Sequence, residues 1–85
     1  MLQANTLNLK LNLKKQPYSQ RLTALRLSAT FADSFNPAAL VAERDLPYPI
    51  TQAQLQLACR QLQQQFRARS VRLLVQSACN KYIRA

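Results

Sequence analysis

Residues 6–14 alternate strictly between polar residues and leucine, and this pattern constrains the fold more than any other feature of the chain. Successive side chains of a β-strand point to opposite faces of the sheet, so a period of two predicts a strand with one buried face. The two predicted faces carry Leu7, Leu9, Leu11 and Leu13 on one side, and Asn8, Lys10, Asn12 and Lys14 on the other.

Residues 21–31 repeat this alternation, with Leu25, Leu27 and Ala29 on the apolar side, and predict a second strand. Pro17 and Ser19 supply turn residues between the two segments. The chain contains no glycine, which the tight two-residue hairpin turns favour. We therefore expect an antiparallel hairpin closed by a longer loop, with an apolar face that a helix must cover.

Two helix starts follow. Asn36 and Pro37 fit the cap and first position of a short helix, which would run through Val41 and Arg44 and end before Pro47. A long helix is predicted over 51–68. Its start is marked by a capping box and by a hydrophobic staple, which the sequence forms from Thr51 with Gln54 and from Ile50 with Leu55. Its apolar stripe recurs at helical spacing through Leu55, Cys59, Leu62 and Phe66.

The segment after the long helix fits two periods. Val71, Leu73 and Val75 alternate as a strand would, and we favour a strand over 70–76. The alternative is a helix over 71–84 packed on the long helix. The predicted fold is one α+β domain over 1–85, in the order β-β-α(short)-α-β with the long helix on the leucine face. The alternative is a β-hairpin followed by a helical hairpin.

Charge composition indicates a binding function. Twelve lysines and arginines face three acidic residues, for a formal net charge of +9, and such an excess attracts polyanions. The absence of glycine and histidine excludes the glycine-rich phosphate-binding loops and removes the usual general base. We therefore expect a non-catalytic protein without cofactor or metal. No signal-peptide pattern is visible, and two cysteines are too few for a disulfide framework, so we expect a cytoplasmic location.

The first functional interpretation is nucleic-acid binding, RNA or DNA, through contacts to the phosphate backbone. Lys10, Lys14 and Arg26 would emerge from the polar face of the hairpin, and Arg60 and Arg67 would share one side of the long helix. Tyr18 is the candidate stacking ring, since neither strand carries an aromatic residue on its polar face. The complete predicted basic set is Lys10, Lys14, Lys15, Arg21, Arg26, Arg60, Arg67, Arg69 and Arg72.

The alternative is an interaction or assembly subunit that binds an acidic protein, or that forms a homodimer. The leucine-rich segment 6–14 is placed at a sheet edge in this interpretation, where its unpaired backbone groups would pair with a second chain.

Overall fold

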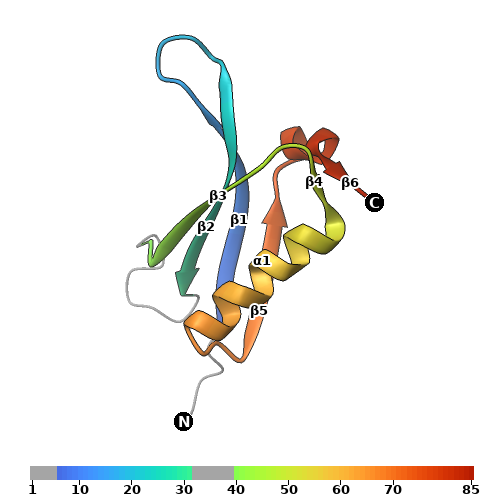
Figure 1. The fold of residues 1–85 in the computed structure, drawn as a ribbon. Helices are drawn as coiled ribbons and strands as arrows, with labels where there is room; N and C mark the ends of the chain where they lie inside the picture. The colour runs from blue at the N-terminus through green and yellow to red at the C-terminus, as the bar shows by residue number, and fades with distance from the viewer. Residues whose placement is uncertain (1–5, 32–39) are drawn as a thin grey trace.

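The computed structural model describes residues 6–31 and 40–85, which form an α+β fold (Figure 1). The strands are β1 (Thr6–Lys15), β2 (Leu22–Phe31), β3 (Ala42–Leu46), β4 (Ile50–Thr51), β5 (Ser70–Val75) and β6 (Ile83–Arg84). The main helix is α1 (Gln52–Gln65), and a 3₁₀ helix, η1 (Ser77–Tyr82), precedes β6. Both predicted hairpin strands, the long helix and the strand after it are confirmed.

Four strands form the main sheet in the order β3-β2-β1-β5. β2 is antiparallel to β1 and to β3, whereas β5 is parallel to β1 because α1 carries the chain back before β5 begins. The register places Leu11 opposite Leu27 and Leu9 opposite Ala29, so the alternating apolar residues of the two central strands share one face. A second, two-stranded sheet pairs β4 with β6.

α1 lies across the leucine face of the sheet (Figure 1). Leu9, Leu11 and Leu27 are at most 1% exposed, as are Leu55 and Leu62 of the helix. These residues belong to one apolar core. Since α1 occupies this side alone, the polar face of the sheet has no helix over it within the described ranges (Figure 1).

The ends of α1 show why it begins and ends where it does. The Thr51 hydroxyl accepts from the Gln54 amide at 3.1 Å, and the Gln54 side chain accepts from the Thr51 amide at 3.0 Å, which confirms the capping box. At the other end the Ala68 amide donates to the Gln63 carbonyl and the Arg67 amide to the Gln64 carbonyl, the Schellman pattern. Arg67 has φ 54°, a conformation that glycine adopts most easily.

This early helix end corrects one prediction about the basic set. The helix was expected to reach residue 68, but α1 ends at Gln65, and the left-handed Arg67 turns the chain away from its axis. Arg60 and Arg67 therefore do not share a helix side. Because the chain has no glycine, the sequence lacked the residue that most clearly marks a helix C-terminus.

Three other predictions are wrong. The predicted start of the short helix, Asn36 and Pro37, lies outside the described residues, but its continuation through Arg44 does not form, since residues 42–46 are strand β3. The strand at 6–14 is not an edge strand, because β1 lies between β2 and β5. Residues 71–84 are not one helix packed on α1, since they divide into β5, η1 and β6.

Candidate nucleic-acid interface

The end of the β1–β2 hairpin projects from the body as a two-stranded arm, residues 13–24 (Figure 1). β3 pairs with β2 only as far as Leu25, and β5 pairs with β1 only as far as Leu11. Beyond those positions the ribbon has no neighbouring strand in the main sheet. The arm is therefore solvated on both edges near its tip.

Hydrogen bonds within the chain hold the tip of the arm in one shape. The Gln16 amide donates to the Arg21 carbonyl at 2.9 Å and closes the six-residue loop 16–21, which confirms the longer loop that the lack of glycine predicts. The Ser19 hydroxyl donates to the Gln16 side chain at 2.7 Å and accepts from the Arg21 amide at 3.3 Å. A tip organised in this way loses less conformational entropy when it binds a partner.

The tip combines positive charge with an uncovered aromatic ring. Tyr18 is 100% exposed, so no side chain of the described residues packs against it enough to hide it from water. Lys15 and Arg21 are also exposed and border the loop that carries Tyr18. No ion pair involves either of these two cations among the described residues.

Aromatic residues brace the base of the arm. The Tyr48 hydroxyl donates to the Leu22 carbonyl at 2.8 Å, and the Tyr48 ring meets the Tyr82 ring edge to face at 6.0 Å. Lys81 Nζ lies 5.2 Å from the centre of the Tyr82 ring. This brace was not found from the sequence, because Tyr48 and Leu22 are 26 positions apart and no local pattern links them.

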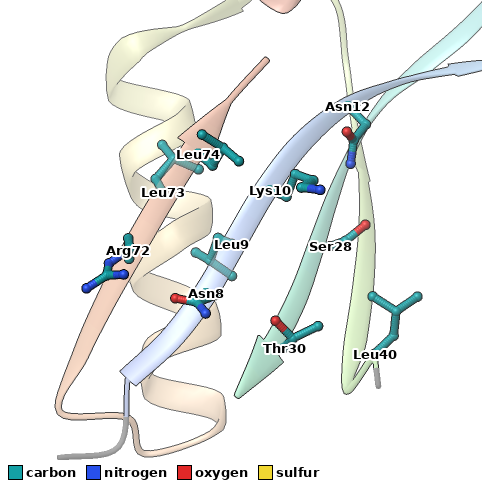
Figure 2. Close-up of a pocket in the computed structure, with 10 residues that line it drawn as sticks. All are labelled: Asn8, Leu9, Lys10, Asn12, Ser28, Thr30, Leu40, Arg72, Leu73 and Leu74. Atoms are coloured by element: carbon teal, nitrogen blue, oxygen red, sulfur yellow. The ribbon is translucent and has the colours of Figure 1, made fainter. Parts of the chain in front are cut away.

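The open face of the sheet carries the next group of predicted residues. Lys10 and Arg72 are diagonal neighbours on β1 and β5, since Lys10 pairs with Leu74 and Asn8 with Arg72. Figure 2 shows their side chains beside a depression of about 650 Å³. Its polar lining includes Asn8, Asn12, Ser28 and Thr30, with Leu40 and Leu74 among its apolar residues. The Asn8 Oδ1 atom is buried there and accepts no hydrogen bond from the described residues.

The acidic residues of β3 neutralise the opposite side of this face. Lys14 Nζ lies 3.0 Å from Asp45 Oδ2, and Arg26 Nε lies 3.1 Å from Asp45 Oδ1. Arg26 also lies 3.7 Å from Glu43. Hydrogen bonds from Lys14 and then Arg26 lower the pKa of Asp45, and the bond to Asp45 raises the pKa of Arg26. The uncompensated charge on the open face therefore lies on the β1–β5 side.

The remaining predicted cations lie elsewhere. Arg60 is exposed on α1, on the other side of the sheet from Lys10. Arg67 and Arg69 lie in the connection between α1 and β5, at the Thr6 end of β1, because Ser70 pairs with Thr6. The arm is at the Lys15 end, so the nine predicted residues do not form one patch. They divide among the arm, the open face, the helix and the far end.

The thiols and acids of the described residues show no catalytic arrangement. Burial raises the pKa of both Cys59 and Cys79, which keeps these thiols protonated. In the described part of the chain, no three residues among histidine, cysteine and the acids come together as a metal site. None of its helices has the length and apolar character to cross a membrane.

Comparison of the chain with protein-family models, with curated proteins and with solved structures found no match.

Proposed function

We propose that this protein binds nucleic acid through the arm, without a catalytic step. Lys15 and Arg21 contact backbone phosphates, and Tyr18 stacks on an unpaired base. The observation that carries the proposal is the placement of a fully exposed ring between two unpaired cations on a preorganised tip. Proteins that bind single strands combine cations for the phosphates with aromatic rings for the bases.

The open face extends this contact along β1. Arg72 lies at the level of Asn8, seven residues before Lys15, which corresponds to about 23 Å along the strand. Lys10 lies between the two levels. A strand of nucleic acid held at the tip would meet Lys10 and then Arg72, while Glu43 and Asp45 repel phosphates from the β3 side. Asn and Ser side chains on this face donate hydrogen bonds to phosphate or sugar oxygens.

The test compares arm and non-arm charges at equal net charge. Lys15→Gln with Arg21→Gln removes two positive charges at the tip, and Arg60→Gln with Arg84→Gln removes two exposed charges elsewhere. We expect the arm variant to bind a labelled single-stranded oligonucleotide about tenfold more weakly at 100 mM salt. Its log–log salt slope should be less steep by about 1.4–1.8, the value for two lost phosphate contacts.

Fluorescence anisotropy from about 50 to 200 mM salt provides both readouts. The control variant should lose less than about threefold, because it weakens the general field without removing a contact. Single strands should bind more tightly than the matching duplex, whose bases are already stacked. Equal losses in the two variants, or equal binding of all strands that disappears with salt, would show that the arm is not the site.

Asp45 provides an independent prediction. Asp45→Asn frees Lys14 and Arg26 on the open face, and we expect affinity to rise about threefold at 100 mM salt, the scale of one added phosphate contact. Glu43→Gln makes the same change in charge but releases only the 3.7 Å contact to Arg26, so its gain should be smaller. Anisotropy titrations of both variants check this order; equal gains would contradict it.

The same pairs give a pH dependence of stability with a defined sign. Because Lys14 and Arg26 lower the pKa of Asp45 in the folded state, the stabilisation they provide is complete above the unfolded-state pKa. It is lost as the pH falls through the folded-state pKa. Chemical denaturation between neutral and acid pH should therefore show a smaller loss of stability for Asp45→Asn than for the wild type.

A further inference from the structure

β5 forms an uncovered edge of the main sheet. In the described structure it pairs with β1 on one side and with no strand on the other (Figure 1). Its sequence, SVRLLV, holds one charge, and Leu73 and Leu74 are 37% and 56% exposed. The opposite edge, β3, carries three consecutive charged residues at 43–45, which is how sheets protect an edge from pairing. β5 lacks that protection.

The direction of the free backbone groups follows from one hydrogen bond. The Gln76 amide donates to the Leu11 carbonyl. Backbone groups alternate in direction along a strand, so residues 70, 72, 74 and 76 point toward β1. Val71, Leu73 and Val75 therefore point their amide and carbonyl groups away from the sheet, where the described residues offer no strand partner.

We propose that β5 pairs antiparallel with β5 of a second copy of this chain, with Leu73 opposite Leu73 of the partner subunit. This register places Val71 opposite Val75 of the partner subunit, so all three outward residues meet outward residues and six backbone hydrogen bonds form. It also places Arg72 opposite Leu74 of the partner subunit. The two sheets join into one with both helices on the same side, since a twofold axis normal to the sheet relates the copies.

The nearest competing register is weaker. Centring the pair on Arg72 aligns only residues 71 and 73 with each other and leaves Val75 without a β5 partner. It also sets two arginines directly opposite one another, which is destabilising. The strand is thus self-complementary in one register. Two six-residue strands make an interface below the standard size, so the dimer is weak and depends on concentration.

A charge swap at the centre of the register tests the proposal. Leu73→Lys and Leu73→Glu each place like charges opposite one another across the twofold axis, so each variant alone should be monomeric. An equimolar mixture should form heterodimers, because lysine then faces glutamate. Sedimentation velocity from about 10 μM to about 1 mM, at about 0.3 M salt to screen the net charge, measures both outcomes. Recovery in the mixture also shows that both variants fold.

A second variant covers the case in which a charge at residue 73 disturbs folding. Leu74→Glu, at a more exposed position, faces Arg72 of the partner subunit on both sides of the axis and should tighten the dimer about tenfold. Leu57→Glu is its matched control on α1, where the leucine is 51% exposed, and it should leave association unchanged. A wild-type chain that stays monomeric to 1 mM, or a wild-type dimer that none of the β5 variants alters, would overturn the proposal. Either result leaves the arm proposal untouched.

Discussion

Leu27→Ala is expected to lower the free energy of unfolding by about 2–5 kcal/mol, the cost of removing a buried leucine side chain and leaving a cavity. Leu27 is 0% exposed and lies on β2, paired with Leu11 of β1 and Arg44 of β3. A chain of 85 residues has a total stability of about 4–13 kcal/mol. This one substitution therefore removes a large share of the stability of the fold.

Urea denaturation and thermal unfolding followed by circular dichroism measure this loss. At about 4–8 °C per kcal/mol for a domain of this size, the unfolding midpoint should fall by 10 °C or more. Leu74→Ala makes the same chemical change on another strand, where the side chain is 56% exposed, and it should cost less than about 1 kcal/mol. Similar losses for the two variants would mean that Leu27 is not in the core.

The position of Leu27 was predictable because alternation within one strand carries the information. Leu25, Leu27 and Ala29 were assigned to the apolar face from spacing alone, and all three are fully buried. The start of α1 was predictable for a similar reason, since Thr51 and Gln54 are three positions apart and bond to each other. Patterns that close within a few residues need no knowledge of the rest of the fold.

β3 was missed because its partner is distant in the sequence. Ala, Glu, Arg and Leu are good helix formers, so residues 42–46 favour a helix by intrinsic propensity. In the fold, Glu43 and Asp45 fall on the same face as Arg26, and their charges complement it across two paired strands. Pairing with a neighbouring strand overrides a weak local preference, and that partner lies 17 to 19 positions earlier.

The candidate site was predictable as a set of residues but not as an arrangement. Net charge identified the cations, yet it gave no indication that Lys14 and Arg26 are held by Asp45, or that Arg67 and Arg69 lie at the end of β1 away from the arm. Those facts depend on strand order and register. Tyr18 was the exception, since a ring in a loop between Lys15 and Arg21 stays beside those cations in any hairpin.

Tyr18→Ala is expected to weaken binding of a single-stranded oligonucleotide by about 5- to 150-fold, the range for loss of one stacked base. The side chain is 100% exposed, so its removal should leave the free energy of unfolding within about 0.5 kcal/mol of the wild type. Loss of affinity without loss of stability is a result that a tyrosine packed on the body would not give.

The salt dependence of this variant distinguishes stacking from charge. Tyrosine carries no charge at neutral pH, so the log–log salt slope of Tyr18→Ala should equal that of the wild type, whereas loss of Lys15 and Arg21 reduces it. Tyr18→Phe keeps the aromatic face and should bind nearly as well as the wild type. If phenylalanine fails to restore affinity, the hydroxyl matters rather than the ring; if alanine binds as well as tyrosine, the arm contacts phosphates alone and the preference for unpaired bases should vanish with it.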